Sequence, residues 1–220
     1  MAHRPSIREF IAHFQGQIPT LEAVEPFTYR KILYATALDP LARAAFGNIG
    51  HRERIVRLIE ELTCWRDCDL VSLPQLQLLL REHERARYRL FREVNDQLRQ
   101  WPSGRILRIS VSPCLDQLLP FADPDEIKLI QKCRYAELFY TYRNNLIHEF
   151  REPGYAMEFS SDKDQPYYHS MARHPWQLAF PVGFFAFIYK SALSGLEKYL
   201  LYRDQDPYAR FDFGSLWRAK

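Results

Sequence analysis

The residues best suited to chemistry lie in one short run, Arg143-Asn144-Asn145-Leu146-Ile147-His148. Histidine suits the role of proton acceptor because its unperturbed pKa lies near neutrality. Arginine suits phosphate because its planar guanidinium presents a fork of N–H donors. The run therefore indicates proton transfer beside a bound phosphate group.

Other familiar catalytic signatures are missing from the sequence. It has neither a Gly-x-x-x-x-Gly-Lys phosphate loop nor a Gly-x-Ser-x-Gly nucleophile turn. His148-Glu149 begins like a zinc-protease motif, but Glu152 stands where the second histidine is required. The four cysteines form no Cys-x-x-Cys pair and are expected to be reduced core thiols. We therefore expect no metal and no other cofactor.

A strong helix start precedes the run. Asp123-Pro124-Asp125-Glu126 offers an N-cap, a proline at the first helical position and a carboxylate at the third. The predicted helix extends to about Arg151, and Pro153-Gly154 ends it. The candidate residues therefore lie late in a long helix.

Helical spacing divides this helix into two faces. The apolar stripe expected to face the core comprises Tyr135, Leu138, Phe139, Tyr142, Leu146 and Phe150. Asn144, His148 and Arg151 lie on the other side, and Arg143 is offset from His148 by about 140°. A partner subunit would complete such a site, so we expect a homodimer with its interface on the face of Asn144, His148 and Arg151.

The Arg-x4-His spacing, with asparagine directly after the arginine, resembles the motif of the HEPN ribonuclease family. The resemblance extends loosely over residues 27–202, because the family places this motif late in a long helix of an antiparallel bundle. It implies a defence or toxin-like endoribonuclease that works without metal, as a dimer whose two motifs line a composite cleft. Arg143, Asn144 and His148 are then the catalytic residues.

The chemistry implied by the resemblance uses the 2′-hydroxyl of the RNA itself. His148 would accept its proton, Arg143 would stabilise the phosphate, and Asn144 would orient His148 or a phosphate oxygen. The expected products are a 2′,3′-cyclic phosphate and a 5′-hydroxyl. Arg8 and His13 share the spacing, but Glu9 follows the arginine, so this second pair is not expected to act.

Two alternatives remain open. In the first, the chain is a catalytically silent HEPN module that dimerises and binds RNA, nucleotide or protein. In the second, the chain is a helical scaffold, and Arg143 and His148 cap the helix end or form salt bridges there with Glu149 or Glu152. Toxins of this family that are silenced by a nucleotidyltransferase carry His-x-Tyr, and the tyrosine is the residue that is modified. Phe150 occupies that position here, so an antitoxin or other regulatory partner is expected to act in a different way.

Further RNA contacts are expected from Arg151 and from the aromatic run after the motif helix, Tyr167, Tyr168 and His169. Aromatic rings stack on unpaired bases. His174 and Trp176 lie in the same stretch. The alternative for all these rings is packing against the helices.

The remaining sequence predicts further helices. Ser6 and Glu9 resemble a capping box, residues 27–46 form a helix interrupted near Pro40, and residues 51–65 form another. Ser72 and Gln75 begin a helix of about 28 residues that ends near Trp101. Acidic residues interleave with its arginines, Arg81, Arg85, Arg87, Arg89, Arg92 and Arg99, so an ion-pair face is favoured over an RNA track.

The last part of the chain predicts a hairpin and a closing helix. Residues 155–159 alternate like a strand, and residues 177–180 form a second extended candidate. An apolar helix follows from Pro181 to about Tyr202, in which Gly183, Ala186 and Gly195 permit close helix contact. The predicted fold is all-α, an antiparallel helical bundle with a short β-hairpin or ordered loop before the last long helix.

Length and composition constrain the number of domains and the class of protein. The chain has 220 residues with a formal net charge of +3, and it predicts one domain of residues 1–220. The bundle core is expected at 27–202, an N-terminal helix and loop at 1–24 and a peripheral tail at 203–220. The longest apolar run is shorter than a membrane span, so we expect no membrane and a cytoplasmic protein. RNA and a second copy of the chain are the expected partners.

Overall fold

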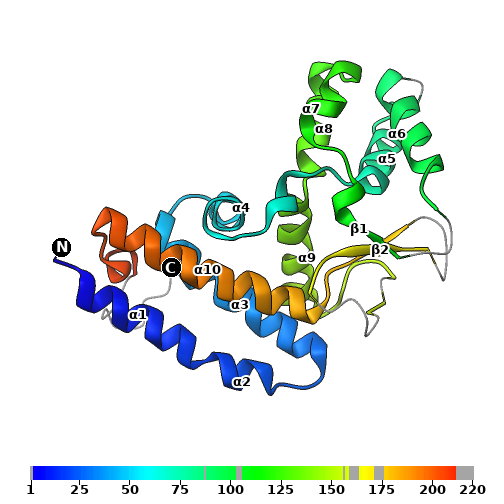
Figure 1. Cartoon of the computed structure of the whole chain (residues 1–220). Coiled ribbons are helices and arrows are strands. Elements are labelled where there is room, and N and C mark those ends of the chain that lie inside the picture. The colour runs from blue at the N-terminus through cyan, green and yellow to red at the C-terminus, as the bar shows by residue number, and fades with distance from the viewer. Residues whose placement is uncertain are drawn as a thin grey trace. The chain divides into compact units, whose positions relative to one another are not determined.

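The computed structural model describes residues 2–86, 88–102, 106–155, 157–158, 164–170 and 176–211. The chain forms two compact units, one of Met1–Cys64 with Ile188–Lys220 and one of Trp65–Phe187, where the sequence predicted one domain. Both units are mostly helical, which confirms the all-α prediction (Figure 1). None of the helices in the described ranges is long and apolar enough to cross a membrane.

The first unit is built from helices. They are α1 (Arg4–Gly16), α2 (Ile18–Glu22), α3 (Phe27–Phe46), α4 (His51–Leu62), most of α10 (Val182–Arg203) and the 3-10 helix η4 (Pro207–Arg210). The α10 backbone passes so close to the end of α4 that a Cβ on Gly195 would lie 1.9 Å from the carbonyl oxygen of Leu62. The predicted close contact at Gly195 is confirmed.

Two local predictions for this unit are wrong. Ser6 does not cap α1, because the helix begins two residues earlier and the Ser6 hydroxyl donates to the carbonyl oxygen of His3. α3 runs through Pro40 without interruption. Leu38 and Leu41 on either side of Pro40 are fully buried, and this packing offsets the hydrogen bond that proline cannot donate.

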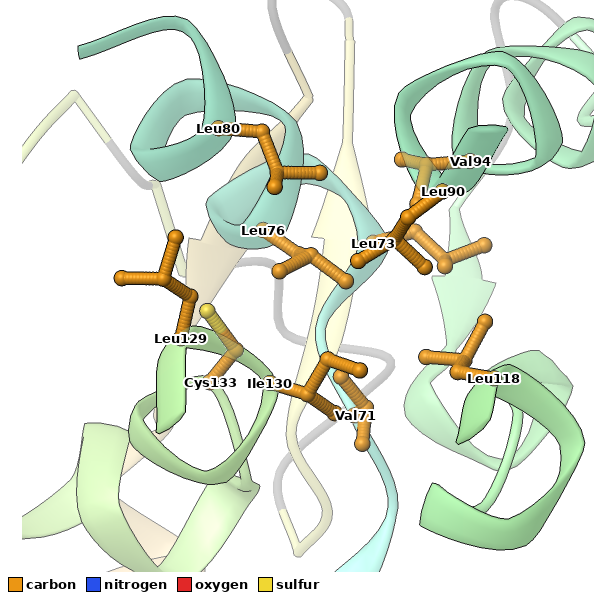
Figure 2. Packing of buried hydrophobic residues seen from close by; sticks show 10 residues of the cluster. All are labelled: Val71, Leu73, Leu76, Leu80, Leu90, Val94, Leu118, Leu129, Ile130 and Cys133. Atoms are coloured by element: carbon orange, nitrogen blue, oxygen red, sulfur yellow. The ribbon is translucent and has the colours of Figure 1, made fainter. Parts of the chain in front are cut away.

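The second unit combines helices with a small sheet. Its helices are η1 (Arg66–Asp69), α5 (Leu73–Glu82), α6 (Arg89–Arg99), η2 (Ile109–Val111), α7 (Leu115–Leu118), η3 (Leu119–Phe121), α8 (Pro124–Lys132) and α9 (Tyr135–Glu149). Side chains from α5, α6, α7 and α8 point into one shared core (Figure 2). Ser72 and Asp123 cap α5 and α8 as predicted.

The predicted helix over residues 73–101 is two helices, α5 and α6. The chain turns at Glu84, whose φ of 57° is left-handed. The Arg85 amide donates to the Leu80 carbonyl at 2.7 Å, and the Glu84 amide donates to the Arg81 carbonyl at 3.0 Å. This pair of bonds is a Schellman C-cap, formed here without glycine. The turn lets α6 return Leu90 to the core that α5 lines.

The predicted helix over residues 124–151 is also two helices, α8 and α9. Cys133 and Arg134 are instead paired with the segment before α5. The Cys133 carbonyl accepts from the Ser72 amide at 2.9 Å, and the Tyr135 amide donates to the Leu70 carbonyl at 3.0 Å. These distant backbone bonds replace the helical ones, so the chain changes direction and α9 begins anew.

A three-stranded antiparallel sheet joins the second unit, with β2 between β1 and β3. The strands are β1 (Leu107–Arg108), β2 (Tyr167–His169) and β3 (Gln177–Ala179). The β2–β3 hairpin before α10 was predicted, but its first strand was placed at residues 155–159. Ala156 and Phe159 lie outside the described residues, and Tyr155, Met157 and Glu158 are not in a strand.

Gly195→Ala tests the close approach of α10 to α4. Its methyl group would overlap the Leu62 carbonyl, so we expect the free energy of unfolding to fall by at least about 2 kcal/mol. Gly16→Ala is the matched control, because a Cβ there meets no atom within 4 Å. Thermal denaturation of both variants checks this. Equal melting temperatures for Gly195→Ala and the wild type would contradict the contact.

Candidate active site

Arg143 lies inside the second unit rather than at its surface. Its side chain is fully buried, with a relative exposure of 1%, and Nη1 donates to Oδ1 of Asn144 at 3.1 Å. Burial on α9 extends from Tyr142 through Arg143 to Leu146, so the buried face is wider than the predicted apolar stripe. A buried guanidinium is stable only when its donors are satisfied. In this structure the Arg143 guanidinium is therefore not open to an RNA phosphate.

His148, in the last turn of α9, is exposed to solvent, in contrast to the buried Arg143. No carboxylate of the described residues lies within ion-pair distance of it. Asn144, one turn earlier, is half-buried. The spacing of Asn144 and His148 places them on one side of the helix. His148 is thus available for proton exchange with a ligand, while Asn144 connects its face to the buried Arg143.

Phe150 is exposed, and its predicted place in the core is wrong. It is the C-cap of α9 with a φ of 54°, and its relative exposure is 67%. The left-handed turn carries the chain out of the helix, so the 3.6-residue period no longer applies to residue 150. Tyr155 and Met157 beyond the turn are exposed as well. Apolar side chains therefore lie at the surface close in sequence to His148.

The acidic residues near the helix end have specific partners. Glu149 pairs with exposed Arg151 at 2.5 Å, and Glu152 accepts a hydrogen bond from the Tyr142 hydroxyl at 2.6 Å. Burial, reinforced by the negative charge of Glu152, raises the pKa of Tyr142. Tyr142 therefore stays protonated and keeps donating. Neither carboxylate has the predicted structural role toward His148.

Side chains from the sheet hold the segment that follows the motif helix. The Met157 amide donates to Nε2 of His169 at 2.9 Å, and the Tyr167 hydroxyl donates to the Met157 carbonyl at 2.7 Å. Glu158 accepts from the first amide of α10, at Val182, at 3.1 Å. These contacts tie residues 157–158 to β2 and α10. No local sequence pattern predicts these contacts, because the partners are ten or more residues apart.

The expected base-stacking role of Tyr167, Tyr168 and His169 is wrong, since all three are fully buried. The Tyr168 hydroxyl donates to Ser72 Oγ at 2.6 Å and accepts from the Tyr135 hydroxyl at 2.9 Å. The alternative of packing against the helices is what the structure contains. Of the two other residues in this stretch, Trp176 lies edge-on to Trp101, and His174 is outside the described residues.

The chemistry open to this site is acid–base catalysis by His148. In the described part of the chain, no group of three or more histidine, cysteine, aspartate or glutamate side chains could hold a metal ion. Its four cysteines are free thiols, Cys64, Cys68, Cys114 and Cys133. His148 and Arg151 are exposed and within reach of a phosphate group, and Arg151 is paired with Glu149.

Acidification should loosen the contact between His169 and Met157. Burial lowers the pKa of His169, so below pH ~6.5 the unfolded chain binds a proton that the folded chain does not. Stability is therefore present at neutral pH and lost as pH falls. His169→Gln keeps an acceptor for the Met157 amide but cannot titrate, and it should lose less stability than the wild type between pH 7 and pH 5.

Urea denaturation at both pH values measures this difference. His148→Gln is the control, because it makes the same substitution at a histidine outside the contact with Met157. Identical losses in the wild type and in His169→Gln would show that His169 is not the titrating group.

The comparisons with known proteins add no family to this geometry. A scan against protein-family models, a search of curated proteins and a search of solved structures each gave no match. The interpretation of the site therefore depends on its residues and their contacts.

Proposed function

We propose that the chain is a metal-independent endoribonuclease of HEPN type, with His148 as the proton acceptor. The observation that carries the proposal is the exposed His148 one helical turn after Asn144, which is bonded to Arg143. With no carboxylate of the described residues within ion-pair distance, exposed His148 offers its ring nitrogens to a substrate. A general base has to come within hydrogen-bond reach of the proton it removes, and an exposed side chain can do so.

The proposed reaction uses few protein groups. His148 removes the proton from the 2′-hydroxyl, the 2′ oxygen attacks the adjacent phosphorus, and the bond to the 5′ oxygen breaks. Solvent protonates the leaving 5′ oxygen, which gives a 2′,3′-cyclic phosphate and a 5′-hydroxyl. Arg151 exchanges its ion pair with Glu149 for the phosphate, and Asn144 orients His148.

Arg143 has a positioning role in this proposal. The motif predicts that it contacts phosphate directly, but its side chain is buried. From inside the unit it holds the Asn144 amide through the 3.1 Å bond. Removing it would cost folding stability as well as activity, because a satisfied buried charge would be lost together with its packing.

The proposed active form is a homodimer. The face with Asn144, His148 and Arg151 is extended by exposed Phe150, and an exposed aromatic side chain is typical of a residue that a partner covers. Two copies of this face would bring two His148 side chains to one cleft. The same proposal includes a role in defence or as a toxin. Because position 150 is phenylalanine and not tyrosine, a regulatory partner would act without modifying this residue.

A second candidate is a catalytically silent HEPN module. The burial of Arg143 favours it, since an active motif would have to present this arginine to the scissile phosphate. The two candidates differ in what happens to RNA: the enzyme cleaves it, and the module binds it or another ligand unchanged.

His148→Ala separates these candidates. A proton acceptor contributes in the transition state, so the variant should lose at least about a hundredfold in cleavage rate while keeping RNA affinity and melting temperature. Cleavage of labelled RNA, fluorescence anisotropy and thermal denaturation measure the three quantities. His13→Ala, which shares the spacing from Arg8, should cleave like the wild type.

A wild-type protein that binds RNA without cutting it, with unchanged binding in His148→Ala, would make the silent module the better account. A large fall in melting temperature on replacing exposed His148 would instead favour a structural role.

Chelation tests the metal-free chemistry. The proposed reaction takes its nucleophile from the substrate, so cleavage should persist at the same rate in excess EDTA. The same RNA, assayed with EDTA and then with added Mg²⁺, gives the comparison. Activity that disappears with EDTA and returns with Mg²⁺ would require a different mechanism.

A further inference from the structure

The described arginines of the α5–α6 hairpin divide into two groups, and Arg87 lies outside the described residues. Arg85 pairs with Asp123 at 2.7 Å and Arg99 with Asp96 at 3.1 Å, as an ion-pair face requires. Three others have no carboxylate of the described residues within ion-pair distance: Arg81, Arg89 and Arg92. These three exposed residues are called the α6 basic face below. The predicted ion-pair face therefore accounts for only part of the hairpin.

Two members of the α6 basic face stack on aromatic rings. Cζ of Arg81 lies 5.6 Å from the ring centre of Phe91, and Cζ of Arg89 lies 4.8 Å from that of Phe121. A guanidinium attracted to the face of a ring is not thereby bonded to a carboxylate. An ion pair would occupy its N–H donors instead. Arg81 and Arg89 thus retain donors for phosphate oxygens.

The rings that support these arginines are themselves fixed. Phe91 and Phe121 both pack against the buried core of the α5–α8 region. The guanidinium groups are therefore partly ordered before any ligand arrives, and less side-chain entropy is lost on binding. This order favours binding, and the contacts with the rings also contribute to the stability of the fold.

Helical spacing places Arg89 and Arg92 together on the exposed side of α6, because they are three residues apart. Arg81 lies against Phe91, which is about 160° from Arg89 around the same helix, so the three arginines are spread over its outer side.

The first turn of α6 contains no acidic residue, while Glu93 and Asp96 follow in the next turns and Asp96 is paired with Arg99. Tyr88, at the start of α6, is 47% exposed, and Cζ of Arg85 lies 4.9 Å from its ring centre, so one face of the ring is covered. The surface therefore combines three basic side chains with an aromatic ring that has one face open.

We propose that the α6 basic face binds single-stranded RNA. Its guanidinium groups contact successive phosphates, and Tyr88 stacks on a base. An acidic protein segment would also pair with the arginines, but it contains no bases to stack on the exposed Tyr88 ring. The choice of RNA depends on the proposed function, and the surface would hold the strand while His148 acts elsewhere on it.

The test is RNA affinity of the full-length protein. The probe is a fluorescein-labelled, 2′-O-methyl oligouridine of about 20 nucleotides, which the proposed chemistry cannot cleave. In the variant Arg81→Gln, Arg89→Gln, Arg92→Gln, Kd should rise at least roughly tenfold near 0.1 M salt. The salt slope of log Kd should fall by about two, since each lost single-strand contact contributes about 0.7.

A matched control is Arg57→Gln with Arg99→Gln. Arg57 also stacks, 4.3 Å from the Phe46 ring centre, but it pairs with Glu61 at 2.7 Å. This control should bind RNA like the wild type, and both variants should melt like it. Tyr88→Ala should weaken binding without changing the salt slope.

Three outcomes would overturn the proposal: no binding by the wild type, affinity of the triple variant within about twofold of it, or equal loss in the matched control. Binding displaced equally well by polyglutamate would assign the surface to an acidic protein. If binding depends on the three arginines but no RNA is ever cleaved, the proposal for the α6 basic face is supported and the proposed ribonuclease activity is rejected.

Discussion

Burial of the Arg143 guanidinium is the constraint that sets the geometry of the candidate site. A charge inside a protein is tolerated only when its donors are satisfied, so the side chain fixes how α9 is rotated about its axis. With Arg143 inward, Asn144 lies at the boundary and His148 lies in solvent. Residues beyond the helix are then held by Tyr142, His169 and Val182 rather than by continuing helical bonds.

This rotation also explains how one motif supports both a catalytic and a silent interpretation. The residue suited to proton transfer is accessible, whereas the residue suited to phosphate is used inside the unit. In our proposals, positive charge for RNA is provided instead by Arg151 and by the α6 basic face. Separation of chemistry from strand binding is consistent with RNA affinity being dominated by phosphate contacts away from the cleavage point.

Local signals in the sequence predicted well where structure is determined locally. The caps at Ser72 and Asp123 and the all-α class followed from capping chemistry and helical periodicity. Helix ends determined by distant partners were missed. Cys133 ends α8 because its carbonyl bonds the amide of Ser72, about 60 residues earlier in the chain, and a periodic pattern contains no trace of such a bond. Glu84 and Phe150 adopt left-handed conformations without being glycine, so the usual stop signal was absent.

For the candidate site too, only the features set by local spacing could be predicted from the sequence. Spacing placed His148 and Asn144 on one side of α9, but it could not show that Arg143 is buried or that Tyr167 to His169 are internal. Those facts depend on what packs against each face. The most direct measurement of the central claim is a crystal structure of the full chain bound to RNA with a single 2′-deoxy nucleotide at the cleavage point. The account predicts an imidazole nitrogen of His148 within about 3.5 Å of that 2′ carbon. RNA bound away from His148, or His148 buried beneath a protein partner with no RNA nearby, would contradict it.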